Sequence, residues 1–268
     1  MKILSGLDLA SYIKERQLHQ SRSLRQSGGV TPRLAIVRTN PSAVVNSYMK
    51  MKQSYGEDID VDVIVHDVDQ KDALSTIKTL NTDPDTHGII VQIPLPDVSQ
   101  TDEILNAVDP RKDVDGLGAK TTFDAATPMA INWLIAGYNI DLRGKNIVIV
   151  GNGRLVGKPL AALWEASDLP VTVLDRSVKN LADATKEADV LVCATGVPAL
   201  ITADMVKPEA IIVDAGVATD SNGLVGDIAA SVRELPNITI TPEKGGVGPL
   251  TICALFDNVL RAALKSSK

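Results

Sequence analysis

The feature that most constrains the fold of this 268-residue chain is a short apolar strand that runs directly into a glycine-rich turn. The strand, Asn-Ile-Val-Ile-Val at residues 146–150, is followed by glycines at Gly151, Gly153 and Gly157. Glycines let a backbone approach a pyrophosphate, whose charge is stabilised by the N-terminus of the next helix. The spacing is a loose form of the dinucleotide fingerprint, but its position between strand and helix favours nucleotide binding over a tight turn that binds nothing.

Two series of apolar strands and amphipathic helices follow one another along the chain. The first series has strands at 34–37, 61–66 and 88–93 and helices at 7–26, 44–55, 72–80 and 103–108. The second has strands at 146–150, 171–174, 190–194, 211–213 and 238–240. This alternation predicts an α/β protein of two α/β domains that flank a cleft, the second a Rossmann-like doubly wound parallel sheet.

The boundaries of the two domains follow from the same pattern. We expect a catalytic domain from residues 1–120 plus 246–268 and a dinucleotide-binding domain from 121–245. An apolar helix at 130–136 is expected to bridge them, and a final helix at 251–265 to return to the first domain.

Composition excludes several classes of partner. The chain is 44% apolar, only 3% aromatic and carries a net charge of −6, with no basic stripe interleaved with aromatics, so no nucleic-acid partner is expected. Charges at Asp8 and Lys14 interrupt any signal-peptide core, and the longest uncharged stretches fall short of a membrane span. We expect a cytoplasmic protein without a membrane partner. Cys193 and Cys253 lie in apolar runs, and the three histidines share no ligand spacing, so no metal is expected.

A tyrosine and a lysine in the first series mark a site for proton chemistry. Tyr48 and Lys52 are four positions apart on a predicted helix and therefore share one face. A phenol and an ammonium at this distance can each shift the other's pKa. In short-chain dehydrogenases such a pair follows the dinucleotide turn within one domain. Here it precedes the turn, which implies a separate substrate domain.

Polar residues at the ends of predicted strands add to this site. Gln92 ends the third strand, where side chains face the ligand crevice of a parallel sheet. Asp115, next to Gly116, is a better ligand group than Asp113, which we expect to be a turn or cap residue. In the second series Asp175 suits a ribose 2′-OH, whereas Arg176 suits the 2′-phosphate of NADP. Asp175 therefore favours NAD and Arg176 favours NADP. A surface ion pair would explain the presence of either residue equally well.

Together these motifs closely resemble one enzyme family. Tyr48-x-x-x-Lys52, Val-Gln-Ile-Pro-Leu-Pro at 91–96, Lys-Asp-Val-Asp-Gly at 112–116, the turn at 151–159 and Gly-Gly-Val-Gly-Pro-Leu-Thr at 245–251 occur in the order seen in bifunctional methylenetetrahydrofolate dehydrogenase/methenyltetrahydrofolate cyclohydrolases. The resemblance runs from the first helix to about residue 260. It implies hydride transfer from 5,10-methylenetetrahydrofolate to NADP, with NAD possible, and then hydrolysis of the methenyl product to 10-formyltetrahydrofolate.

The resemblance also implies residue roles. Lys52 is the main proton-transfer group of the water step, Gln92 holds and tunes it, Tyr48 stacks on or orients the folate, and Asp115 hydrogen-bonds the pterin's amino edge. The further substrate contacts that it implies are Val91, Pro94, Gly246 and Pro249. The cofactor contacts that it implies are Gly151, Asn152, Gly153, Arg154, Leu155, Val156, Asp175, Arg176, Thr195, Gly196, Val217 and Thr251.

The chain departs from the family pattern at three places. Many members have Gly-Arg-Ser at the phosphate turn, where this chain has Gly151-Asn152-Gly153. Arg154 and Arg176 are then the substitutes for the missing phosphate contacts. The segment from Asn40 to Tyr48 is a residue or two longer than usual, and Glu-Lys at 243–244 replaces a common Val-Pro. These differences bear on cofactor preference and efficiency more than on the fold.

Two other functions and an assembly state complete the expectations. A different two-domain dehydrogenase for small hydroxy or amino acids would need an Arg and His pair for a carboxylate, which is not evident. A non-catalytic nucleotide-binding protein would have no need of the Lys-Gln-Asp set. The resemblance implies a homodimer, which apolar residues 190–203 support weakly, since ordinary core explains them equally well.

Overall fold

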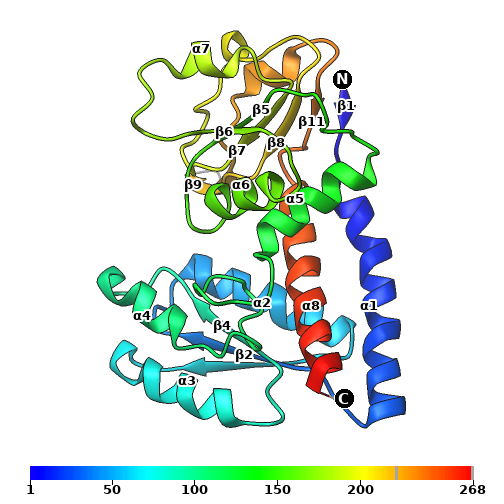
Figure 1. The fold of residues 1–268 in the computed structure, drawn as a ribbon, viewed down its shortest axis with the longest axis vertical. Helices are drawn as coiled ribbons and strands as arrows, with labels where there is room; N and C mark the ends of the chain where they lie inside the picture. Colours follow the sequence, from blue (N-terminus) through cyan, green and yellow to red (C-terminus); the bar gives the residue numbers. More distant parts are fainter. Residues whose placement is uncertain (221–222, 267–268) are drawn as a thin grey trace. The chain divides into compact units, whose positions relative to one another are not determined.

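A computed structural model of the chain describes residues 1–220 and 223–266 and shows an α/β protein (Figure 1). The chain forms two compact units. One contains Met1–Ala10 and Thr127–Thr251, and we call it the six-stranded unit after its sheet. The other contains Ser11–Ala126 and Ile252–Lys268, and we call it the three-stranded unit.

The sheet of the three-stranded unit is parallel, with the strand order β3-β2-β4. Its strands are β2 (Arg33–Arg38), β3 (Asp62–Asp67) and β4 (Gly88–Gln92). The chain passes from the central strand β2 to β3 on one side and then to β4 on the other. The direction of winding therefore reverses between β2 and β4, and the carboxyl ends of these strands form the crevice where ligands bind in such sheets.

The helices around this sheet are α1 (Gly6–Gly28), α2 (Ala43–Asp58), α3 (Ala73–Thr82) and α4 (Thr101–Asn106), with 3-10 turns η1 (Gln70–Asp72) and η2 (Val98–Gln100). Helices α2 and α3 lie on opposite sides of the sheet (Figure 1). Helix α2 begins at Ser42, whose hydroxyl accepts a hydrogen bond from Val45 N. At the end of α3, Lys112 Nζ donates to the carbonyls of Leu80 and Asp83, which satisfies acceptors that the helix leaves unpaired.

The sheet of the six-stranded unit is also parallel, with the strand order β1-β11-β8-β7-β5-β6. Its strands are β1 (Lys2–Ile3), β5 (Ile147–Val150), β6 (Val171–Leu174), β7 (Val190–Cys193), β8 (Ile211–Asp214) and β11 (Thr239–Ile240). The chain moves outward from β5 to β6 and then returns to β7 on the other side of β5. The switch point of this doubly wound sheet therefore lies between β5 and β7.

The remaining elements of this unit are helices and one hairpin. They are α5 (Ala126–Gly137), α6 (Gly157–Glu165), α7 (Leu181–Thr185), η3 (Ala203–Met205), η4 (Ala230–Glu234) and the antiparallel strands β9 (Ala218–Asp220) and β10 (Gly223–Val225). The core is aliphatic, as the scarcity of aromatics predicted. Trp164 on α6 is its one large buried aromatic among the described residues of this unit.

The last helix, α8 (Val247–Ser266), joins the three-stranded unit from Ile252 onward, as predicted. Gln17 Nε2 donates to the carbonyl of Cys253 at 2.7 Å, and Asn258 Nδ2 donates to the carbonyls of Val114 and Asp124. By length and composition alone this helix could cross a membrane, but 61% of its 18-residue apolar window is buried inside the fold. Its buried hydrogen bonds and packing are those of a core helix.

The elements that the sequence predicted are present, with ends shifted by a few residues. Strand β1 and the hairpin β9–β10 were not predicted. Of the apolar stretch 190–203, residues 190–193 form the buried central strand β7, whereas Val197 is 45% exposed. The strand is core of a single chain and gives no support to a dimer.

Candidate active site

Lys52 and Gln92 meet at the switch point of the three-stranded sheet. Lys52 projects from α2, the helix that follows β2, and Gln92 is the last residue of β4. Lys52 Nζ donates to Gln92 Oε1 at 3.1 Å, and Gln92 Nε2 donates to the carbonyl of Ile93 at 3.1 Å. Both ends of the amide are engaged, so the glutamine has one orientation and offers its oxygen to the lysine.

The segment 113–116 runs beside β4 and brings Asp115 toward this pair. A parallel bridge joins Ile89 to Asp113, so the chain past Asp113 advances alongside β4. Asp113 Oδ1 accepts from Gly116 N at 3.2 Å and its Oδ2 from Gly118 N at 2.8 Å. Asp113 therefore shapes the turn, as the sequence predicted. Asp115 interacts electrostatically with Lys52.

Burial shifts the protonation of Lys52 and Asp115 in the same sense, toward the neutral forms. Burial lowers the pKa of Lys52, and the charge of Asp115 partly opposes that shift. Burial likewise raises the pKa of Asp115, Lys52 opposes it, and the charge of Asp113 adds to the rise. A lysine with a lowered pKa can exchange a proton near neutrality, which an exposed lysine does poorly.

Tyr48 lies one helical turn before Lys52 on α2 and is partly buried. Burial raises the pKa of its phenol, which keeps it protonated at neutral pH. Val91 is 2% exposed and packs into the core, so it can contact a ligand only through its backbone. Pro94 follows a cis peptide bond and is exposed, and its carbonyl accepts from Asn40 Nδ2 at 3.4 Å.

Gly246 and Pro249, the other predicted substrate contacts, belong to the six-stranded unit. A Cβ at Gly6 would lie 1.8 Å from the carbonyl oxygen of Gly246, and Leu7 N donates to the carbonyl of Gly245 at 3.0 Å. The start of α1 and the double glycine therefore pass each other too closely for a side chain at Gly6. Substrate contact by Gly246 and Pro249 stays a prediction.

The glycine turn after β5 has the geometry that the sequence predicted. Gly151 has φ +108°, and a Cβ there would lie 2.4 Å from the carbonyl oxygen of Ala194, which follows β7. A Cβ at Gly157 would lie 1.7 Å from the carbonyl oxygen of Gly151. A Cβ at Gly153, by contrast, would meet nothing within 4 Å. The turn thus opens at the β5–β7 switch point and leads into the N-terminus of α6, which fits a pyrophosphate.

The other predicted cofactor contacts also belong to this unit. They line the glycine turn or follow the ends of strands, except Thr251, which lies on α8. Val156 and Thr195 are partly exposed, and the exposed ones are Asn152, Gly153, Arg154, Leu155, Asp175, Arg176, Gly196 and Val217. The Thr251 hydroxyl lies 3.3 Å from the carbonyl of Val247 and 3.4 Å from Thr127 Oγ1, so it is already engaged within its own unit.

Asp175 and Arg176 follow β6, and only one of them is committed to a local bond. Asp175 Oδ1 accepts from Ser177 N at 2.9 Å and from Ser177 Oγ at 2.6 Å, and these bonds lower the pKa of Asp175. Arg176 forms no hydrogen bond or ion pair within residues 1–220 and 223–266. The surface ion pair between the two, which was the alternative to a cofactor contact, is absent from that described part of the chain.

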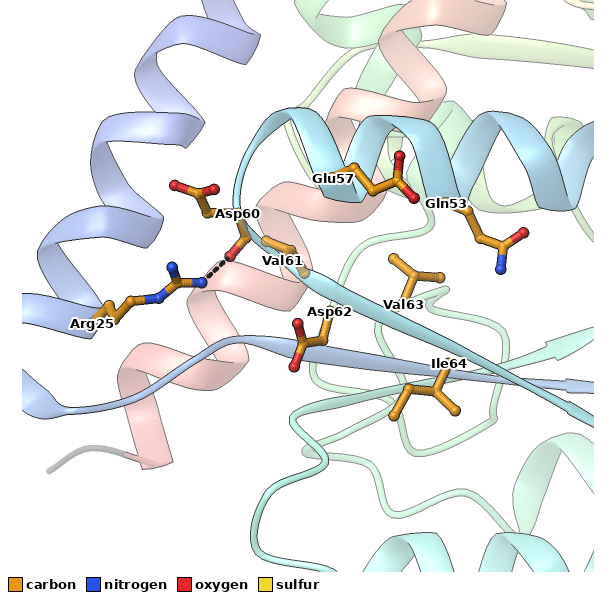
Figure 2. A pocket seen from close by; sticks show the side chains of 8 residues that line it. All are labelled: Arg25, Gln53, Glu57, Asp60, Val61, Asp62, Val63 and Ile64. Atoms are coloured by element: carbon orange, nitrogen blue, oxygen red, sulfur yellow. Dashed lines mark hydrogen bonds between the residues drawn. The ribbon is translucent and has the colours of Figure 1, made fainter.

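A separate hollow of about 440 Å³ lies at the free edge of β3 and contains none of the predicted site residues (Figure 2). It is lined by Arg25, Gln53, Glu57, Asp60, Val61, Asp62, Val63 and Ile64. Three of these are acidic, and Arg25 is engaged with the carbonyl of Asp60 at 3.2 Å. The hollow is therefore poorly suited to an anionic ligand. Within the described residues no group of three or more His, Cys, Asp or Glu could hold a metal ion.

The fold and the glycine turn define a dinucleotide-binding protein of two α/β units, with the Lys52–Gln92 pair in the three-stranded unit. Family models support a narrower assignment. The catalytic-domain model of tetrahydrofolate dehydrogenase/cyclohydrolase matches residues 4–115, and its NAD(P)-binding-domain model matches residues 125–267. The chain belongs to the tetrahydrofolate dehydrogenase/cyclohydrolase family.

Individual relatives are similar over their full length. The chain is 37% identical to the bifunctional protein FolD of Nautilia profundicola over 282 residues, covering 100% of this chain and 99% of that protein. The crystal structure of FolD from Campylobacter jejuni superposes with a TM-score of 0.93 at 33% identity over 99% of each chain. That of Trypanosoma brucei FolD, complexed with NADP and an inhibitor, gives 0.91 at 25% identity, covering 98% of this chain and 97% of that one.

Proposed function

We propose that this chain oxidises 5,10-methylenetetrahydrofolate to 5,10-methenyltetrahydrofolate with NADP and hydrolyses the product to 10-formyltetrahydrofolate. The observation that carries the proposal is the half-buried Lys52–Gln92 pair with Asp115 nearby, in a chain that also holds a dinucleotide turn. A nucleotide-binding protein without activity has no use for a desolvated lysine held by a fixed amide.

The hydride step depends on binding and orientation more than on acid–base groups. NADP supplies the hydride acceptor when it is bound. The Gly151–Gly157 turn and the N-terminus of α6 suit its pyrophosphate, because backbone N–H groups and the helix dipole both favour negative charge there. Tyr48 would orient the folate, and Asp115 would hydrogen-bond its amino edge, as the family resemblance implies.

The water step is where Lys52 acts. Its neutral amine takes a proton from the attacking water as the oxygen bonds to the methenyl carbon. The resulting ammonium returns that proton to the ring nitrogen as its C–N bond breaks, and the remaining hydroxyl proton is released to solvent as the oxygen becomes the formyl carbonyl. Gln92 holds Nζ in position without adding charge, and burial lowers the pKa of Lys52, which favours the neutral amine that begins the cycle.

The residues after β6 support NADP over NAD. The carboxylate of Asp175 is occupied by Ser177, which competes with a ribose 2′-OH for the same oxygen. The exposed guanidinium of Arg176 has no partner in the described part of the chain and suits a 2′-phosphate. A contact from Arg176 would partly replace those lost with the Arg and Ser that many family members carry at the turn.

Two measurements test the proposal. Methylenetetrahydrofolate and NADP are mixed with the protein, and reduced nucleotide, methenyl absorbance and its decay are followed together. Titration of a non-reactive folate analogue separates this function from the other dehydrogenase and from the non-catalytic nucleotide-binding protein, since only a folate enzyme should bind it. A protein that reduces neither NADP nor NAD with this substrate would exclude the function.

We also propose a cytoplasmic C2 homodimer. The family resemblance supports the homodimer. The interior position of α8, the one long apolar helix among the described residues, supports a location outside the membrane. In a C2 dimer of this kind each chain would keep a complete set of site residues. Light scattering at micromolar concentration tests the assembly, and a stable, fully active species of 28.5 kDa would contradict it.

A further inference from the structure

Asp227 is fully buried in the six-stranded unit. It is neither one of the site residues expected from the sequence nor part of the proposed mechanism. Its Oδ2 accepts a hydrogen bond from Thr195 N at 2.6 Å and another from Thr195 Oγ1 at 2.9 Å. Thr195 Oγ1 in turn accepts from Val197 N at 3.1 Å. One carboxylate oxygen thus fixes the backbone and side chain of the turn that follows β7, at the switch point of the sheet.

A second, partly buried carboxylate holds Asp227 itself. Asp214, the last residue of β8, accepts from Asp227 N and Gly216 N, both at 3.1 Å, through Oδ1. Its Oδ2 accepts from Ile228 N at 3.2 Å. Asp214 therefore ties the loop after β8 to the segment that carries Asp227. The loops after β7 and β8 share a single buried anchor.

Two glycines show how closely this anchor fits. A Cβ at Gly216 would lie 2.0 Å from Asp227 Oδ1, and a Cβ at Gly226 would lie 2.0 Å from Asp214 Oδ2. Asp227 Oδ1 is buried and has no hydrogen-bond partner among the described residues. A carboxylate oxygen without a partner costs stability, so it is retained here against the energetic preference. Rotating the Asp227 side chain to give Oδ1 a hydrogen-bond partner would break both bonds between Oδ2 and Thr195.

The anchored turn reaches the surface although its anchor does not. Thr195 is partly exposed, Gly196 is exposed and has φ +68°, and Val197 is 45% exposed. The same edge of the sheet carries the glycine turn, since a Cβ at Gly151 would touch the residue before Thr195 and Thr195 itself. We infer that Asp227 is a positioning residue of the NADP site, which acts through Thr195 by holding the 195–197 turn in its nucleotide-binding shape. The inference rests on the proposed function for the identity of the nucleotide.

A double-mutant cycle on nucleotide affinity tests this inference. Asp227→Asn, Thr195→Val and the double variant are titrated with NADP and NADPH at equilibrium, without turnover. Because a hydrogen bond to a charged acceptor is lost, each single variant should bind about tenfold more weakly. The double variant should bind no more weakly than the worse single variant, because Thr195→Val removes one of the two bonds that Asp227→Asn already disrupts. Dehydrogenase activity should fall far more than the nucleotide-independent hydrolysis of added methenyltetrahydrofolate.

The same unit offers a matched control. Thr202 Oγ1 donates to Asp204 Oδ1 at 2.5 Å in an exposed Thr–Asp pair away from the turn. Asp204→Asn should leave nucleotide affinity and both activities as in the original protein.

Three outcomes would overturn the inference. These are unchanged affinity in Asp227→Asn, additive losses in the double variant, and an equal loss of both activities with a lowered unfolding temperature. If Asp227→Asn does not fold, Thr195→Val alone decides: weaker binding at an unchanged unfolding temperature supports the inference, and unchanged binding overturns it. Failure of the proposed function looks different, since the original protein would then lack both activities.

Discussion

Lys52 Nζ lies 3.1 Å from Gln92 Oε1, an acceptor that is polar but carries no charge. The lysine is thereby held at the end of β4 without the charged partner that would lock it as an ammonium. The charge that does act on it comes from Asp115 and is weaker than the effect of burial. The protonation of Lys52 is therefore set by two opposing influences, and each can be changed separately.

Replacing Asp115 by Asn should lower the pKa of Lys52 further. The charge of Asp115 raises that pKa, so its removal leaves burial unopposed. Hydrolysis requires the neutral amine and rises with pH through the pKa of Lys52. The midpoint of the rise should therefore move to lower pH in the residual activity of Asp115→Asn. A pH–rate profile with added methenyltetrahydrofolate measures it, and a midpoint that moves upward would contradict the assignment.

Replacing Gln92 by Glu should have the opposite effect. A carboxylate in hydrogen-bond contact with Nζ favours the ammonium and raises the pKa of Lys52. The rising limb of the hydrolysis profile should move to higher pH, with a lower rate at neutrality. Gln53→Glu places the same charge on an exposed neighbour of Lys52 and should hardly move the limb, because solvent screens it. Equal shifts in the two variants would show that the contact with Gln92 is unimportant.

Replacing Arg176 by Ala should weaken NADP selectively. A guanidinium–phosphate contact is a charge-assisted bond, so its loss should raise the Kd for NADP about tenfold and leave NAD unaffected. Lys179→Ala removes another exposed cation from the same loop and serves as the control. Equal weakening of both nucleotides by Arg176→Ala would show that this arginine does not read the 2′-phosphate.

Replacing Tyr55 by Phe should destabilise the three-stranded unit. The Tyr55 hydroxyl donates to Gln17 Oε1 at 2.7 Å and contacts Cys253 Sγ at 3.1 Å, which links α1, α2 and α8. Its loss leaves the buried amide oxygen of Gln17 without this donor, at a cost of about 1–3 kcal/mol. Urea unfolding measures the change. Tyr12→Phe, at a tyrosine that is 74% exposed, should have no effect, and equal stabilities of the two variants would contradict the prediction.

Much of the fold could be predicted because its strands are short runs of Val, Ile and Leu, as in any buried parallel sheet. Strand β1 could not, since two residues give no period, and Lys2–Ile3 becomes a strand only by pairing with Thr239–Ile240. The β9–β10 hairpin was missed for a similar reason, because strands of three residues are set by their partner and not by pattern.

Some residues of the candidate site could likewise be predicted from the sequence, and others could not. Lys52 and Gln92 were predictable because helical spacing and the strand-end rule both act locally. Asp227 was not, because its partner Thr195 lies 32 positions away and no local pattern links them. The contact between Asp227 and Thr195 is long-range. Its one sign in the sequence is the pair Gly216 and Gly226, where a side chain would collide with Asp227 and Asp214.

The central claim is that one chain carries both reactions and that Lys52 serves the second. The most direct measurement compares the original protein with Lys52→Met, each given methylenetetrahydrofolate and NADP, while reduced nucleotide and methenyl absorbance are followed together. General acid–base groups contribute about 10²–10⁴-fold, so hydrolysis should fall by that order while NADP reduction persists. Methenyltetrahydrofolate should then accumulate in step with NADPH in the variant and decay in the original protein. Hydrolysis of the methenyl compound by Lys52→Met at the original rate would contradict the account.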